Sequence, residues 1–188
     1  MLLQDRGMAF IDFDNINITA RRQHGIKYMD FNKLREVLLN DLRCVGCTVY
    51  LPNKMRNLLA YIQKSGLEVK VVSPGKSVDG RLIFDLLANT YKNSFDTAVI
   101  ASGDRDYIPV VEYVKQMKKR VLVGSFSSAL AHGLVSVSDG IIDLDKHIPE
   151  IASKIFEYTC SKCGKKFELP FKLFASQTPR CRDCIKAQ

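Results

Sequence analysis

Two short acidic motifs in this sequence have the residue types and spacing of a divalent metal site. The first, Asp12-Phe13-Asp14-Asn15, follows an apolar stretch, and the second, Gly103-Asp104-Arg105-Asp106, follows another. Carboxylates that lie close together repel each other unless a cation lies between them. Hard oxygen ligands select Mg²⁺ or Mn²⁺. The two motifs therefore predict a metal centre that can hydrolyse a phosphate ester.

The elements that must position these motifs alternate between apolar strands and amphipathic helices, which is typical of a three-layer α/β fold with an open parallel sheet. Ligands of such sheets bind outside the carboxyl ends of the strands, where the strand order reverses. With the order 3-2-1-4-5, the first and fourth strands are neighbours at that point. We predict strands at 8–13, 47–51, 67–72, 97–101, 120–124 and 141–144, and helices at 30–41, 53–64, 79–91, 106–118 and 127–132.

Four aspartates are expected near this reversal. Asp12 ends the first strand, Asp104 follows the fourth, and Asp79 opens the helix after the third, with Asp106 in a first helical turn. Asp79, Asp104 and Asp106, and also Asp14, have a simpler alternative role as helix N-terminal residues. Their coincidence at one sheet edge favours the metal site. Asn15 adds either a neutral oxygen ligand for the metal or a hydrogen-bond donor to a phosphate.

Other polar residues have weaker signals. Lys76, in the loop before Asp79, can pair with a phosphate or simply face solvent, and Arg105 is a further candidate contact to the substrate. Asp85 lies six residues after Asp79 and is expected to face solvent. Cys44 and Cys47 form an isolated pair, which we interpret as buried structural cysteines.

The C-terminal segment contains Cys160, Cys163, Cys181 and Cys184, two C-x2-C pairs separated by 17 residues. This spacing is typical of a structural Zn²⁺ site with four thiolates, which leaves no open position for catalysis. Disulfides are the alternative, and the cytoplasmic location expected below disfavours them. We therefore predict two domains, residues 1–150 and a zinc ribbon at 151–188, in which the metal replaces a large core.

Charge and hydropathy limit the possible functions. The net charge is +8, and residues 151–188 carry 8 Lys and Arg against 3 acidic residues. This excess predicts binding to a polyanion, most often nucleic acid, through residues such as Lys165 and Lys166. The chain contains no apolar run of about 18 residues and no signal-peptide pattern, so we expect a cytoplasmic protein without a membrane span.

Three segments resemble the motifs of NYN domains, close to the LabA-like branch of the PIN-like nuclease superfamily. They are residues 10–16, 76–87 and 101–111, and residues 127–130 and 139–144 resemble the closing part of the domain. The resemblance covers about residues 7–145, and the tail resembles a zinc ribbon. It implies PIN-like topology and a metal-dependent nuclease that acts on RNA. Position 13 is Phe where many relatives have Gly, so its side chain either narrows the substrate approach or points into the core.

The resemblance also implies roles for individual residues. Asp12, Asp79, Asp104 and Asp106 would hold Mg²⁺ or Mn²⁺. Asn15 would orient substrate or water, and Ser102 would bind phosphate beside the metal.

Two other functions compete with this hypothesis. One is a non-catalytic RNA-binding or adaptor protein on the same fold. The other is a haloacid-dehalogenase-like phosphatase, with Asp12 as nucleophile and Asp14 as acid and base. The expected partner is RNA; a protein partner of the zinc ribbon and a homo-oligomer are left open.

Overall fold

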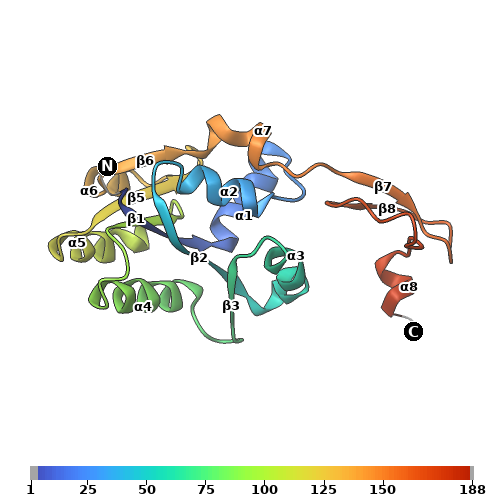
Figure 1. The fold of residues 1–188 in the computed structure, drawn as a ribbon, viewed down its shortest axis with the longest axis horizontal. Helices are drawn as coiled ribbons and strands as arrows, with labels where there is room; N and C mark the ends of the chain where they lie inside the picture. The colour runs from blue at the N-terminus through green and yellow to red at the C-terminus, as the bar shows by residue number, and fades with distance from the viewer. Residues whose placement is uncertain (1–3, 187–188) are drawn as a thin grey trace.

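A six-stranded parallel sheet forms the centre of the protein, in a computed structural model that describes residues 4–186 (Figure 1). The strand order is β3-β2-β1-β4-β5-β6, with all neighbours parallel. The predicted order 3-2-1-4-5 is therefore confirmed, and β6 extends it. The strands are β1 (Arg6–Asp12), β2 (Arg43–Pro52), β3 (Glu68–Val72), β4 (Thr97–Ala101), β5 (Arg120–Ser125) and β6 (Gly140–Asp143).

Helices cover both faces of the sheet, which gives the predicted three layers. Successive residues of β1 point to opposite faces, so Ala9 and Ile11 enter one core and Phe10 enters the other. One core is closed by α1 (Phe13–His24), α2 (Phe31–Leu38), α3 (Leu59–Gln63) and α7 (Ile148–Ile151). The other is closed by α4 (Val78–Tyr91), α5 (Ile108–Gln116) and α6 (His132–Val137).

Helix α1 was not predicted from the sequence. It contains two Asn, two Ile, one Asp and one Thr, which have modest helix propensity. Packing stabilises it, because Phe13, Ile16 and Ala20 lie on one face and are buried. Phe13 is 2% exposed and stacks on Phe31, so its side chain points into the core.

Two helix predictions were wrong in detail. The stretch 53–64 is a 3₁₀ helix, η1 (Asn53–Leu58), followed by α3, and the N-cap of η1 is Pro52 instead of Asn53. The expected helix at 127–132 is a turn, and α6 begins only at His132. The backbone N–H of Ala131 donates to the Gly103 carbonyl at 2.9 Å, which ties this segment to the loop after β4.

The predicted buried cysteine pair is half wrong, since Cys47 is buried but Cys44 is exposed. Both lie on β2, whose first residues extend beyond the core.

A small C-terminal module follows the α/β sheet (Figure 1). It contains the antiparallel strands β7 (Phe156–Thr159) and β8 (Lys166–Leu169) and the short helix α8 (Arg182–Lys186). Contacts with the sheet domain include an ion pair of the Lys27 ammonium with Glu168 at 2.8 Å and the Lys64 ammonium, which lies 5.1 Å from the ring centroid of Phe171. Between residues 4 and 186, no helix has the length and apolar character needed to cross a membrane. The division at residue 150 stays a prediction.

Candidate active site and zinc module

Asp12 lies where the strand order reverses, at the end of β1 between β2 and β4. Its side chain is 5% exposed and caps α1, because Oδ1 accepts a hydrogen bond from the Asn15 backbone N–H at 3.2 Å. The other oxygen, Oδ2, lies 3.3 Å from the hydroxyl of Tyr107. One oxygen of Asp12 therefore caps the helix, and the other faces the Tyr107 hydroxyl. The region at the ends of β1 and β4, around these two side chains, is called the crevice below.

Asp79 reaches the same hydroxyl from the first turn of α4, whose N-cap is Ser77. The Tyr107 hydroxyl donates to Asp79 Oδ1 at 2.8 Å. A hydroxyl has one proton to donate, and ionised carboxylates only accept. Tyr107 can therefore donate to only one of the two carboxylates at a time. The oxygen of the other carboxylate then lies near the Tyr107 oxygen with no proton between them.

This arrangement changes the acidity of Asp12. The pKa of its carboxyl is raised to about 6, chiefly by burial; the neighbouring charges of Asp79 and Asp14 add to this rise, and hydrogen bonds from Asn15 and Tyr107 oppose it. Desolvation penalises the charged form unless opposite charge is supplied. A bound cation would supply that charge.

The loop after β4 is pinned against the start of α1. The Gly103 backbone N–H donates to Asn15 Oδ1 at 2.9 Å. A side chain at Gly103 would collide with the carbonyl of Ala129, so only glycine allows this close approach. Asp104 caps the 3₁₀ helix η2 (Arg105–Tyr107), because its Oδ1 accepts from the Asp106 N–H at 3.0 Å.

The predicted ligands are thus brought to one edge of the sheet, but to different degrees. Asp12 and Asp79 share a hydroxyl, Asp104 is half-buried, and Asp106 is exposed. Within residues 4–186, no three carboxylates bring their ligand atoms within 4.8 Å of one another. The four-aspartate ligand set stays a prediction.

Asp14, which belongs to the first acidic motif and was also considered as a helix cap or a phosphatase acid, fits a cation at this edge. Its Oδ2 pairs with the ammonium of Lys54 at 2.7 Å. Its Oδ1 is buried and has no hydrogen-bond donor. A buried carboxylate oxygen without a donor is costly, and a divalent ion held with Asp12 would satisfy it.

Tyr107 is the functional residue that the sequence analysis missed. It is fully buried, and burial together with the charges of Asp12 and Asp79 raises the pKa of its hydroxyl well above the usual range. It therefore acts as a neutral donor. Its position one residue after Asp106 was the available signal, but a tyrosine in a helical stretch is most often a core residue.

The candidate substrate residues have different environments. Ser102 is fully buried, and its hydroxyl accepts from the Asp104 N–H at 3.2 Å, inside the turn. Arg105 and Lys76 are exposed. Lys76 lines a hollow of about 600 Å³ together with Lys70 and Arg81, beside the start of α4.

Asp85 does not face solvent as expected but is 5% exposed. Its Oδ2 accepts from Lys70 at 2.9 Å, from Arg81 at 3.1 Å and from the Tyr50 hydroxyl at 3.1 Å. The partners on β2 and β3 are distant in sequence, so helical spacing alone missed them. Asp85 joins α4 to the sheet edge.

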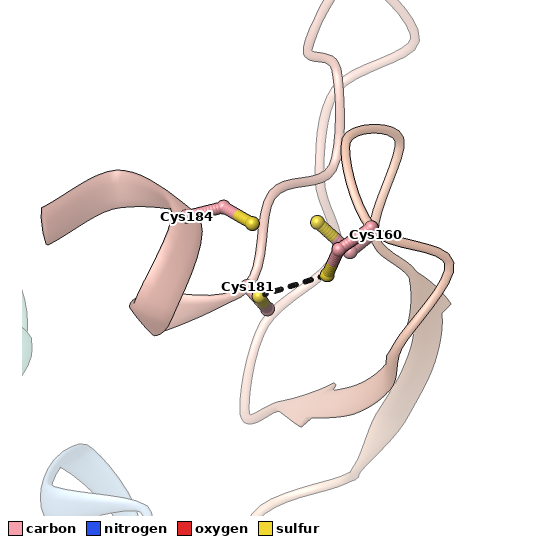
Figure 2. Close-up of side chains that lie close together, drawn as sticks. Cys160, Cys181 and Cys184 are labelled. Carbon is pink, nitrogen blue, oxygen red and sulfur yellow. Dashed lines mark hydrogen bonds between the residues drawn. The ribbon is translucent and has the colours of Figure 1, made fainter. Parts of the chain in front are cut away.

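The thiols of Cys160, Cys163, Cys181 and Cys184 lie together. Figure 2 shows three of them, Cys160, Cys181 and Cys184, with their side chains close to one another. The four sulfur atoms all lie within 4.8 Å of one another, and Sγ of Cys163 is 3.6 Å from that of Cys181. Thiolates in a tetrahedral Zn²⁺ site with bonds of ~2.3 Å are about 3.8 Å apart. The cluster therefore fits Zn²⁺ and contains no disulfide.

The backbone favours a thiolate at Cys160. Hydrogen bonds from the backbone of Cys181, Cys163 and Lys162 lower the pKa of Cys160 to about 6. The pKa of Cys184 is raised to about 12, chiefly by its hydrogen bond with Cys163. Four adjacent thiols cannot all ionise without a cation between them, so this donor set matches Zn²⁺.

The lysines of the module differ in their availability. Lys165 pairs with Asp183 at 2.9 Å, whereas Lys166 is exposed and has no ion pair among the residues described.

In fold, the sheet domain is a PIN-like nuclease domain. The profile of the NYN domain matches residues 6–145, and the chain belongs to that family. A crystal structure of a protein of unknown function from Vibrio parahaemolyticus is similar, with a TM-score of 0.66 at 20% identity; the match covers 77% of this chain and 96% of that one. At this identity the similarity concerns the fold alone. A search of curated proteins gives no significant match.

Proposed function

We propose that this protein is a metal-dependent ribonuclease that hydrolyses RNA phosphodiesters in the crevice between the ends of β1 and β4. The observation that carries the proposal is the pair of the buried Asp12 and the half-buried Asp79, which share the single proton of Tyr107 at the switch point of an NYN fold. Two carboxylates compete there for one hydroxyl proton, and the nearby Oδ1 of Asp14 is buried without a hydrogen-bond donor. A cation would therefore be favourable at this site.

Residues of the chain would have distinct roles there. Asp12 and Asp79, together with Asp104 and Asp106, would hold Mg²⁺ or Mn²⁺. Such an ion neutralises charge in an in-line displacement and acidifies a water that it holds. Tyr107 fixes the orientation of the two inner carboxylates, and Asn15 holds the loop of Gly103 against α1. The exposed ammonium of Lys76 and the exposed guanidinium of Arg105 would contact phosphates.

The zinc module would contribute binding and no chemistry. Four thiolates complete the coordination of Zn²⁺. Exposed cations such as Lys166 would bind the phosphates of the RNA backbone. We expect this protein to work in the cytoplasm, where thiols stay reduced.

The phosphatase hypothesis is less well supported, because it needs Asp14 as a free acid and base. Asp14 is instead paired with Lys54 at 2.7 Å. The match to the NYN family also favours a nuclease.

The test is cleavage of a labelled structured RNA by purified protein with Mg²⁺, Mn²⁺ or no added divalent ion. Omission of the ion after desalting is better than EDTA, which would also remove Zn²⁺ from the cysteines. The variant is Asp79→Asn, which keeps an acceptor for Tyr107 but removes the charge. The matched control is Asp5→Asn, an exposed aspartate that precedes the opposite end of β1.

We expect metal-dependent cleavage that Asp79→Asn abolishes and Asp5→Asn preserves. Cleavage that survives Asp79→Asn would place the activity elsewhere. RNA binding without cleavage under every metal would instead support the adaptor function.

A further inference from the structure

A second hollow, of about 300 Å³, lies beside α1 on the side of the zinc module. Four of its lining residues are aromatic, namely Phe13, Tyr28, Phe31 and Tyr61. Its size is at the lower end of the range for small-molecule sites, about 300–1,000 Å³. The hollow therefore fits one flat group and is far too small for a duplex.

The aromatic rings of this hollow hold one another in place. Phe31 stacks on Phe13 with centroids 6.1 Å apart, and Tyr61 meets Phe31 edge-on at 6.3 Å. The Tyr61 hydroxyl donates to the Met29 carbonyl at 3.0 Å. Tyr28 is half-buried and lies edge-on to Tyr61 at 6.5 Å. The site is thus already formed in the absence of a ligand.

The polar groups of the hollow are available for a ligand. Among residues 4–186, neither the Asn17 amide nor the Arg21 guanidinium has a hydrogen-bond or ion-pair partner, and Arg21 is exposed. Lys27, in contrast, is held by Glu168. Phe13 and Phe31 are buried, so the partly exposed rings of the hollow are those of Tyr28 and Tyr61. These two rings, a free amide and a free guanidinium match a nucleobase, which has a π-face and polar edges, next to its phosphate.

Helix α1 links the hollow to the crevice. Phe13 directly follows Asp12, and α1 leads from there to Arg21, about 12 Å further at ~1.5 Å per residue. Tyr28 also lines a separate hollow with Lys166 and Phe167 of the zinc module. A strand that leaves the crevice along α1 would therefore meet the aromatic hollow and then the module.

We propose that this hollow binds one unpaired base of an RNA strand whose backbone crosses the crevice, so that the substrate class is single-stranded RNA. The assignment of the strand to the crevice rests on the proposed function; the base site itself rests on the rings and on Arg21 and Asn17. A paired base cannot enter, because its polar edge is occupied and its neighbours are stacked.

The test compares Arg21→Ala with Arg22→Ala in the full-length, zinc-loaded protein. Both arginines are exposed, lie in the last turn of α1 and have no partner among the residues described, but Arg22 does not line the hollow. Loss of general charge is therefore matched. Binding of a short, unstructured, labelled RNA is measured without added divalent ion, and equal melting temperatures of the two variants control for folding.

We expect Arg21→Ala to bind this RNA about tenfold more weakly than Arg22→Ala, since Arg21 loses a charged hydrogen bond. In a series of oligonucleotides that each have one abasic nucleotide at a different position, one member should bind about tenfold more weakly than the others. Annealing a complementary strand should remove the difference between the variants.

Equal affinities of the two variants, or equal losses at every abasic position, would overturn the base site. Cleavage of the same RNA by wild-type protein with Mn²⁺ separates the two proposals. If cleavage occurs but the variants bind alike, the ribonuclease stands and the base site falls. If the Arg21-specific loss appears without cleavage, the base site stands and the ribonuclease falls.

Discussion

Asp12→Asn should stabilise the metal-free protein while it abolishes cleavage. The carboxyl of Asp12 is 5% exposed, and burial, with the neighbouring charge of Asp79, raises its pKa from 3.8 to about 6. An asparagine at this position can still accept the Asn15 N–H. Its amide can also donate to the Tyr107 oxygen, which leaves the Tyr107 proton for Asp79. The substitution therefore completes the hydrogen bonds that two carboxylates cannot complete.

The magnitude follows from the two pKa values. A shift of about two units corresponds to about 3 kcal/mol of unfavourable ionisation at neutral pH. Because the folded-state pKa is the higher one, the native state keeps the proton longer than the unfolded chain. The free energy of unfolding of the wild-type protein therefore falls as the pH rises from about 4 to 6, and the full cost is present above that range.

The assay is chemical denaturation of wild-type and Asp12→Asn proteins without Mg²⁺ or Mn²⁺, at about pH 8 and about pH 5. We expect a gain of up to about 3 kcal/mol at the higher pH and roughly half of it at the lower one. Added Mg²⁺ should stabilise the wild-type protein and reduce the difference, because the ion binds only the native state.

A loss of stability on Asp12→Asn at both pH values would refute the reasoning, because it would mean that the charged form of Asp12 is favourable in the fold. An equal gain at both values would show that burial of charge is not the cause. Asp5→Asn, at an exposed position, should change stability by less than about 0.5 kcal/mol.

Three further perturbations test other parts of the site. Tyr107→Phe removes a hydrogen bond that lowers the pKa of Asp12, so the rise of the cleavage rate with pH should occur at higher pH. A pH dependence that does not move would exclude this role of Tyr107. Removal of Zn²⁺ by a chelator should unfold residues 156–186 and leave the sheet folded, which limited proteolysis and circular dichroism can follow; simultaneous loss of the sheet would contradict it. Lys76→Ala should weaken RNA binding and reduce the salt slope by about one, whereas Lys92→Ala, at the far end of α4, should not.

The sequence predicted the parts of the fold that have a strong local signal. Apolar runs located the strands, and the rule for parallel sheets placed Asp12 and Asp104 at neighbouring strand ends. The cysteine spacing predicted a cluster whose sulfur atoms lie within 4.8 Å. Each of these features is decided by residue type and spacing alone.

The remainder depends on contacts between distant residues. Helix α1 has a weak intrinsic propensity and depends on the packing of Phe13 and Ile16. The turn at 127–132 is fixed by the loop that contains Gly103, which its own sequence does not encode. Asp85 is buried by partners from β2 and β3. A single-sequence pattern contains none of this information.

The structure also shows that helix capping and metal binding are compatible roles for the same aspartates. Asp12 and Asp104 each cap a helix with Oδ1, through the N–H of Asn15 and of Asp106 respectively. The second oxygen of Asp12 faces the Tyr107 hydroxyl, and that of Asp104 has no hydrogen-bond partner among the residues described. Capping fixes the side chain of each aspartate before any ion arrives, so little rotamer freedom would remain to be lost on binding. The cap that makes such an aspartate look ordinary in the sequence is therefore part of what would make it an effective ligand.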